Sequence, residues 1–315
     1  MALNVSVDCG RGFVKVASYT DKGEIEKFTF YNRIEENVKD RMTKDSYLVE
    51  YSGKNYRVGE ASADVTSKEQ ELDKLSEKYK IGIYTAVALM IRKLENVSVN
   101  HSINLKVNVP LDKYKIETER ERYKNFFDSK VSIRLDGRIF TFEINSVKVL
   151  YEGAGFLLSN MKKLSEEGKF FTLIDWGTLN LTFAEFSNEL RINVNRCGSL
   201  KTGANPLMNK IYRELSSMGE HYSNYDIHEH LKGTKNFPAH AKEKVESVVE
   251  DFVEREVFAK LDMLDYNNKF VFSGGTSLLL RKYIEKVMIE RGCEYEISDN
   301  AWFDNAVGYL KVGKK

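Results

Sequence analysis

Apolar and polar positions alternate along the first part of the chain, as expected for strands with one buried face. Residues 3–8 form one such stretch, and residues 13–19 resume the alternation after Gly10-Arg11-Gly12. Glycines between two alternating stretches favour a hairpin. We also predict a strand over residues 24–34 and a second hairpin over residues 47–58.

Helical spacing first appears at residues 84–94, where Ala86, Leu89, Met90 and Leu94 share one face. The charge-rich residues 68–80 before it are expected to be solvated. The pattern up to the middle of the chain then predicts strands at 103–109, 131–135 and 140–150, a polar surface helix at 115–127 and a helix at 155–165.

The opening pattern returns in the second half. Residues 170–175 form an apolar stretch that ends in Asp175, and the turn Trp176-Gly177-Thr178 leads into a returning strand at 179–186. Residues 190–194 are predicted to continue that strand. A buried strand, an aspartate, a glycine turn and an antiparallel strand thus occur twice, which predicts two related domains. The rest of the second half predicts helices at 205–218, 225–231, 239–264, 277–290 and 302–312 and a strand at 269–273.

Composition narrows the functional classes. The chain has 315 residues, 42% hydrophobic and 30% charged, which is typical of globular proteins and leaves room for two domains. The formal charge of +1 predicts no general attraction to DNA or membranes. Cys9, Cys197 and Cys293 are scattered, and His228 and His230 are two apart on a predicted helix, so neither a zinc site nor a disulfide framework is expected. With no signal-peptide pattern and no membrane-spanning stretch, we expect a cytoplasmic protein.

The first glycine turn has the form D-x-G-x-G-x-x-K. Gly10 and Gly12 allow the backbone to approach an anion and to direct its N–H groups toward phosphate oxygens. Lys15 follows on the returning strand, and Asp8 could hold Mg²⁺ through water. The alternative is an ordinary hairpin with an exposed lysine.

Two further turns carry similar chemistry. Asp175-Trp176-Gly177-Thr178 would supply a second backbone cradle and a second carboxylate for phosphoryl chemistry. Gly274-Gly275-Thr276 lies between a predicted strand and helix, where paired glycines let a flat ring or a phosphate contact the backbone. Each turn alone is also compatible with an ordinary connection.

The two Asp-Gly turns, the Gly-Gly-Thr turn and the segment Asp304–Tyr309 together resemble the actin-like ATPase superfamily, and most of all the ParM-type plasmid-segregating bacterial actins. The resemblance runs from Asp8 to Tyr309. It implies an α/β actin-like fold of two related domains, each a mixed sheet with flanking helices, with nucleotide in the interdomain cleft. We expect domain I at residues 1–155 together with 298–315, and domain II at 156–297.

The resemblance also implies roles for individual residues. Glu152, before the interdomain helix, would orient or deprotonate the attacking water; the alternative is a first-turn glutamate favoured by the helix dipole. Asp8 and Asp175 would hold Mg²⁺ and share in catalysis. The nucleotide would be bound by Gly10, Arg11, Gly12, Lys15, Gly177, Thr178, Gly274, Gly275 and Thr276.

The second turn departs from the family pattern. Thr178, Leu179, Asn180 and Thr182 occupy positions where a further glycine and small hydroxyl residues are usual, which we expect to reshape the γ-phosphate site. Gly198 and Gly203 are candidates for the ribose side.

The function that the resemblance implies is a polymerising ATPase that binds ATP and ADP with Mg²⁺. Its filaments would move plasmid DNA through a ParR-like adaptor bound to a centromere-like site, without direct contact to DNA or membrane. The alternatives are a non-polymerising actin-fold ATPase and a small-molecule kinase of the same superfamily.

Overall fold

The computed structural model describes residues 2–38, 46–59, 75–94 and 101–313. The chain divides into two compact units, unit 1 comprising residues 1–159 and 305–315, and unit 2 comprising residues 160–304. The sequence placed these boundaries after residues 155 and 297. Each unit has its own sheet and its own hydrophobic core.

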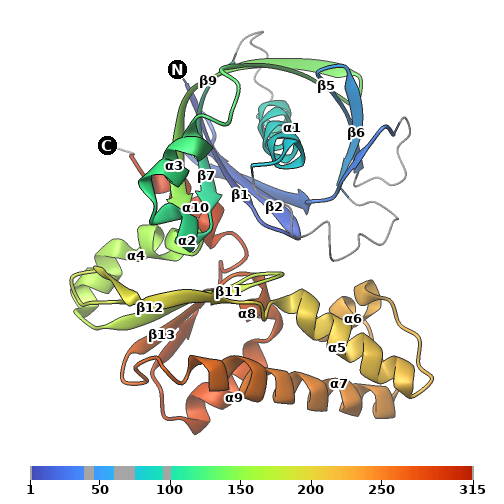
Figure 1. Cartoon of the computed structure of the whole chain (residues 1–315), viewed down its shortest axis with the longest axis vertical. Helices are drawn as coiled ribbons and strands as arrows, with labels where there is room; N and C mark the ends of the chain where they lie inside the picture. Colours follow the sequence, from blue (N-terminus) through green and yellow to red (C-terminus); the bar gives the residue numbers. More distant parts are fainter. Residues whose placement is uncertain (1, 39–45, 60–74, 95–100, 314–315) are drawn as a thin grey trace. The chain divides into compact units, whose positions relative to one another are not determined.

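Unit 1 is built on a nine-stranded sheet with the strand order β3-β2-β1-β7-β9-β8-β5-β6-β4. Its strands curve around one helix, α1, which is seen nearly end-on in Figure 1. The strands of unit 1 are β1 (Leu3–Cys9), β2 (Phe13–Tyr19), β3 (Ile25–Tyr31), β4 (Ile34–Glu36), β5 (Ser46–Tyr51), β6 (Lys54–Gly59), β7 (His101–Val109), β8 (Lys130–Leu135) and β9 (Arg138–Tyr151). Its helices are α1 (Glu77–Lys93), α2 (Leu111–Tyr114), α3 (Glu117–Lys124) and α10 (Asp304–Lys311), and α4 (Ala154–Glu167) begins in unit 1 and ends in unit 2.

Helix α1 corrects two expectations. It begins at Glu77, capped by the Ser76 side chain, and not at residue 84. Twelve of its residues are buried, because the curved sheet surrounds it and an apolar surface on all sides is stabilised there. The expectation of a solvated stretch at 68–80 is wrong for Tyr79, which is only 5% exposed, and residues 60–74 lie outside the described residues.

Unit 2 contains a five-stranded sheet in the order β12-β11-β10-β13-β14, with α5, α7 and α9 covering one face (Figure 1). The strands are β10 (Phe171–Trp176), β11 (Leu181–Phe186), β12 (Ile192–Leu200), β13 (Lys269–Ser273) and β14 (Tyr295–Ile297). The helices are α5 (Ala204–Ser217), α6 (Asn224–Leu231), α7 (Ala239–Asp251), the π-helix η2 (Phe252–Val257), the 3₁₀-helix η3 (Phe258–Leu261), α8 (Gly275–Leu279) and α9 (Arg281–Glu290).

The duplicated pattern predicted from the sequence is confirmed at the level of strand order. The first five strands of the large sheet, β3-β2-β1-β7-β9, repeat in the small sheet as β12-β11-β10-β13-β14. In both series the first pairs are antiparallel, and the pairs after β1 and β10 are parallel.

Several predicted boundaries in unit 2 are wrong. Residues 192–200 form a separate edge strand, β12, because the chain turns back at residues 187–191, where the N–H of Ser187 donates to the carbonyl of Arg191 at 2.9 Å and Leu190 has φ 62°. The helix predicted at 239–264 becomes a π-helix at Phe252, and the helix predicted at 277–290 is interrupted at Leu280. The short strand β14 was not predicted.

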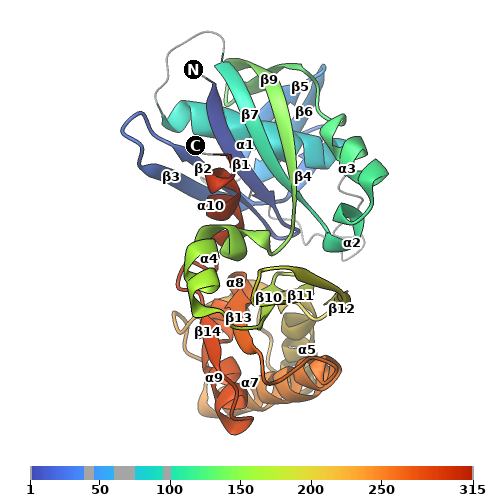
Figure 2. The same ribbon diagram turned by 90° about the vertical axis from the view of Figure 1, so that its left-hand side faces the viewer.

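The C-terminal helix α10 packs against β2 and the start of α4 (Figure 2). A Cβ on Gly308 would lie 2.0 Å from the carbonyl oxygen of Gly155, so only glycine permits this approach. The buried Lys106 on β7 donates to the carbonyl oxygens of Leu310 and Val312 at 2.9 and 2.7 Å, holding the end of α10. Among the described residues, no helix is long and apolar enough to cross a membrane.

Candidate functional site

The first glycine turn is a tight connection between β1 and β2. The N–H of Gly10 donates to the carbonyl of Phe13 at 3.0 Å, which closes residues 10–13 into a turn. Asp8 lies opposite Lys15 in the antiparallel pair, and the Lys15 Nζ is 3.3 Å from Asp8 Oδ2. The buried strand thus ends with a carboxylate and an ammonium beside the turn.

Asn32, just after β3, holds the backbone of this turn. Its Nδ2 donates to the carbonyl of Gly10 at 2.7 Å, and its N–H donates to the carbonyl of Gly12 at 3.0 Å. Two turn carbonyls are therefore occupied by one residue from the neighbouring strand connection, and Arg11 lies between them in sequence.

Asn108, near the end of β7, contacts both Asp8 and the residue after it. Its Oδ1 accepts from the N–H of Cys9 at 3.1 Å, and its Nδ2 donates to Asp8 Oδ1 at 2.7 Å. Asn108 is 1% exposed and Asp8 is 3% exposed. Sequence reasoning missed Asn32 and Asn108; for Asn108, the available signal was a polar residue near the end of a strand whose last five residues are all buried.

The second turn has the same backbone connection. The N–H of Gly177 donates to the carbonyl of Asn180 at 2.9 Å, which closes residues 177–180. Asp175 occupies the position of Asp8, and its cross-strand partner is Thr182. No lysine therefore faces this carboxylate from the returning strand.

The start of α5 and the Thr276 hydroxyl bind the carbonyls of the second turn. Three consecutive N–H groups donate to them: Gly203 to Leu179 at 2.9 Å, Ala204 to Gly177 at 3.2 Å and Asn205 to Thr178 at 2.8 Å. Within the described part of the chain, the N–H groups of residues 178–180 donate no hydrogen bond. Consecutive N–H groups without protein acceptors are suited to an anion such as a phosphate.

Gly203 was a candidate for the ribose side, and its immediate contact is with the second turn. A Cβ there would lie 2.5 Å from the backbone of Thr178 and Leu179. Gly198, the other candidate, lies under the ring of Phe183, which a Cβ would approach to 3.0 Å. The ribose assignment of both residues remains a prediction.

The Gly-Gly-Thr turn lies directly against the second turn. Gly274 has φ +85°, and a Cβ on it would lie 2.4 Å from the Trp176 carbonyl oxygen and 2.5 Å from Asp175 Oδ1. The Thr276 hydroxyl donates to the carbonyl of Gly177 at 2.8 Å. Unit 2 therefore brings Asp175, Gly177 and the 274–276 turn together.

Gly275 has a different neighbour. A Cβ on this residue would lie 2.4 Å from two carbons of the Trp302 ring. Nucleotide contact was the predicted reason for glycine at this position, whereas the structure shows that the Trp302 side chain already requires it.

Glu152 occupies the turn between β9 and α4. Its N–H donates to the carbonyl of Val109 at 2.9 Å, and the Asn305 Oδ1 accepts from the N–H groups of Gly153 and Gly155 at 3.2 Å each. Burial raises the pKa of Tyr79 well above its usual value, and Cys9, Tyr123, Glu152 and Asp8 raise it further, in that order.

The residues present fit a magnesium-bound nucleotide. Magnesium keeps most of its waters, so single carboxylates such as Asp8 and Asp175 suit it. In the described residues no group of three or more His, Cys, Asp or Glu side chains could hold a metal directly. The Asn180 Oδ1 is buried and has no hydrogen-bond partner among them, which leaves one further acceptor for a metal-bound water.

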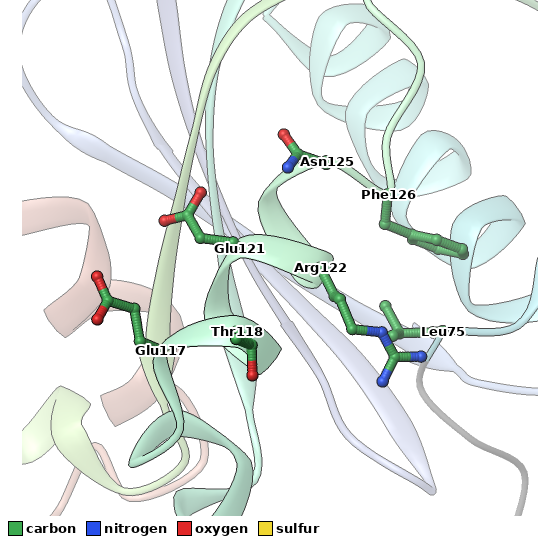
Figure 3. Close-up of a pocket in the computed structure, with 7 residues that line it drawn as sticks. All are labelled: Leu75, Glu117, Thr118, Glu121, Arg122, Asn125 and Phe126. Carbon is green, nitrogen blue, oxygen red and sulfur yellow. The ribbon is translucent and has the colours of Figure 1, made fainter.

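A pocket of about 830 Å³ lies elsewhere in unit 1, on α3 (Figure 3). Glu117 and Glu121 point to one side of the helix, and Arg122 points toward Leu75. The pocket contains none of the predicted site residues; its lining is Leu75, Glu117, Thr118, Glu121, Arg122, Asn125 and Phe126.

Comparisons with known proteins agree with this architecture. Residues 6–155 match the family model described as the N-terminal domain of actin-like proteins. No curated protein sequence matches the chain.

Solved structures match nearly the full length of the chain. The archaeal actin homolog Ta0583 has a TM-score of 0.77 at 16% identity, with 99% of each chain covered. A ParM from a 15-stranded filament of Clostridium botulinum has a TM-score of 0.75 at 19% identity, again with 99% of each chain covered. A non-polymerisable mutant of pCBH ParM has a TM-score of 0.76 at 18% identity, covering 100% of this chain and 99% of that one. The chain therefore has the actin-like fold, and its residues 6–155 match the N-terminal domain described for actin-like proteins.

Proposed function

We propose that this chain binds ATP and ADP together with Mg²⁺. The observation that carries the proposal is the second turn, whose carbonyls are bound by α5 and Thr276 while the N–H groups of residues 178–180 have no acceptor among the described residues. The first turn repeats its backbone connection. Two such turns, each preceded by an aspartate, are suited to a polyphosphate and a hydrated metal ion.

Individual roles follow from chemistry at each turn. Lys15 and the N–H groups of both turns would bind phosphate oxygens, and the Gly274–Thr276 turn would cover the adenosine. Asp8 and Asp175 would hold the waters of the metal ion. Magnesium, when bound, would neutralise charge on the phosphates. Glu152 would orient or deprotonate the attacking water, which makes the protein an ATPase.

We further propose that the ATP-bound protein assembles into filaments that move plasmid DNA in the cytoplasm through a ParR-like adaptor. Similar folds include AlfA of a B. subtilis plasmid and Alp12, both described as filaments, at 16% and 21% identity. The near-neutral charge of +1 supports an adaptor and not direct DNA contact.

Calorimetry of ATP binding with and without Mg²⁺ tests the nucleotide site. We expect tight binding with the metal and weak binding without it, and Asp8→Ala should remove most of that difference. Equal ATP affinity of the wild type in both conditions would contradict the proposal.

Pelleting after addition of Mg-ATP tests the filament. Sedimentation with ATP, and not without nucleotide, separates a polymer from a non-polymerising ATPase or a small-molecule kinase. A protein that binds ATP and stays in the supernatant at every concentration would remove the filament and retain the nucleotide site.

A further inference from the structure

Asn108 lies outside every sequence motif of the candidate site, yet it is the residue that contacts Asp8 from the neighbouring parallel strand. We propose that Asn108 is a positioning residue, which fixes the Asp8 carboxylate so that it can hold the waters of Mg²⁺. This inference rests on the proposed function, because it assigns a task to the metal-binding aspartate.

The hydrogen bonds determine how the Asn108 amide is oriented. The Cys9 N–H can only donate, and it points at one end of the amide at 3.1 Å. That end must be the oxygen, so the nitrogen faces Asp8 Oδ1, at 2.7 Å. The strand backbone thus selects the orientation in which the amide donates to the carboxylate.

Asn108 is itself held in place. It is 1% exposed on β7, next to β9, and its carbonyl oxygen accepts from the hydroxyl of Tyr79 at 3.2 Å. Tyr79 belongs to the buried helix α1. Packing and hydrogen bonds from surrounding elements are what keep a functional side chain in one orientation.

A neutral donor has a specific consequence for Asp8. The Asn108 Nδ2 fixes Oδ1 without adding a charge, and Lys15 approaches the other oxygen, Oδ2, at 3.3 Å. The two contacts thus hold the carboxylate in a defined plane. A leucine of similar size would remove both hydrogen bonds while filling the same space.

The test compares Asn108→Leu with Asn104→Leu. Asn104 lies four residues earlier on the same strand, and among the described contacts its Oδ1 accepts only from the exposed hydroxyl of Ser146, at 2.9 Å. ATP affinity is measured by calorimetry with Mg²⁺ and with EDTA, and thermal unfolding checks that each variant is folded. For Asn108→Leu we expect the enhancement by Mg²⁺ to fall about tenfold, as for the loss of a hydrogen bond to a charged group. Its affinity without metal should change less than twofold, and Asn104→Leu should match the wild type.

Other outcomes would overturn the inference. Equal losses with and without Mg²⁺, or an unchanged enhancement, would leave Asn108 a purely structural residue. If Asn108→Leu does not fold, Asn108→Ser is tested by the same ratio of ATP affinity with Mg²⁺ to ATP affinity with EDTA. If neither variant folds, Asn108 is assigned a role in stability alone. A wild type without any enhancement by Mg²⁺ contradicts the proposed function itself, and is recognised before any variant is made.

Discussion

The two glycine turns have one backbone design and different side-chain surroundings. In each, a buried strand ends in Asp8 or Asp175, a four-residue turn closes with a hydrogen bond from a glycine, and an antiparallel strand returns. The residue across from the aspartate is Lys15 in unit 1 and Thr182 in unit 2.

The neighbouring parallel strand differs in the same way. Asn108 on β7 donates to Asp8, whereas Ser273 on β13, paired with Asp175, donates to Asp304 at 2.8 Å. In unit 1, Asn108 and Lys15 contact the carboxylate of Asp8 and Asn32 holds the turn backbone, whereas in unit 2 the turn backbone is held by α5 and Thr276. The same backbone design is therefore stabilised by different contacts in the two units.

The largest difference is expected in the loss of stability when a turn glycine of each unit is replaced by alanine. Gly274→Ala should lower the free energy of unfolding by about 3 kcal/mol, because φ is +85° and the new Cβ would lie 2.4 Å from a carbonyl oxygen. Gly10→Ala meets only the Phe13 oxygen at 3.1 Å and should cost about 1 kcal/mol or less. Denaturant unfolding measures both; equal costs would show that the second turn yields as easily as the first.

Glu152 and Ser298 follow the fifth strand of their respective series, β9 and β14. Glu152→Ala should lower ATP turnover about a hundredfold or more, since a group that positions water acts in the transition state. Ser298→Ala removes a hydroxyl that donates to Asp304 at 3.0 Å and should leave turnover within about threefold.

Phosphate release and light scattering, measured together, check the Glu152 prediction. After ATP addition, light scattering of Glu152→Ala should rise to a plateau, whereas that of the wild type should rise and decay. Wild-type turnover in Glu152→Ala would return this residue to a role at the start of α4.

Replacing the residues across from the two aspartates, Lys15 and Thr182, should give a smaller difference, measured as ATP affinity. Lys15→Met should weaken ATP binding about tenfold, through loss of a charge that reaches phosphate, while Thr182→Val should change it less than twofold. Calorimetry with Mg²⁺ measures both. If Thr182→Val loses more ATP affinity than Lys15→Met, the prediction that the cross-strand residue of unit 1 binds phosphate is wrong.

The smallest effect concerns two buried lysines. Burial lowers the pKa of Lys106 to about 8, with a contribution from Lys148, whereas for Lys269 the carboxylates of Glu296 and Glu167 outweigh burial and raise the pKa. Between pH 8 and 10.5 the unfolded chain holds the Lys106 proton more tightly than the folded chain, so stability rises with pH there.

Comparison with Lys106→Met isolates this contribution. The wild type should gain about 1 kcal/mol relative to Lys106→Met between pH 7.5 and 9.5, less than the full shift because solvent screens part of the charge. Lys269→Met should show no such gain. If the free energies of unfolding of wild type and Lys106→Met change with pH in parallel, the buried Lys106 ammonium makes no such contribution.

The amino-acid sequence by itself determined the repeated strand-turn-strand pattern, the positions of both aspartates and most element types. These features depend on local spacing: alternation fixes the strands, and glycines fix the turns. The length and the burial of helix α1 were underestimated, because the sequence does not show that a sheet will surround it.

Only the tertiary structure decided what holds each turn. Asn32 reaches the first turn from the segment after β3, and Asn108 reaches it from β7. Gly203 reaches the second turn from the start of α5, and Trp302 explains the glycine at position 275. At the first turn, these contacts join residues that are 22 and 100 positions apart in the sequence. In unit 2 they likewise join residues from separate elements. Local patterns carry no information about such pairings, because they arise when the sheets assemble and bring distant strand ends together.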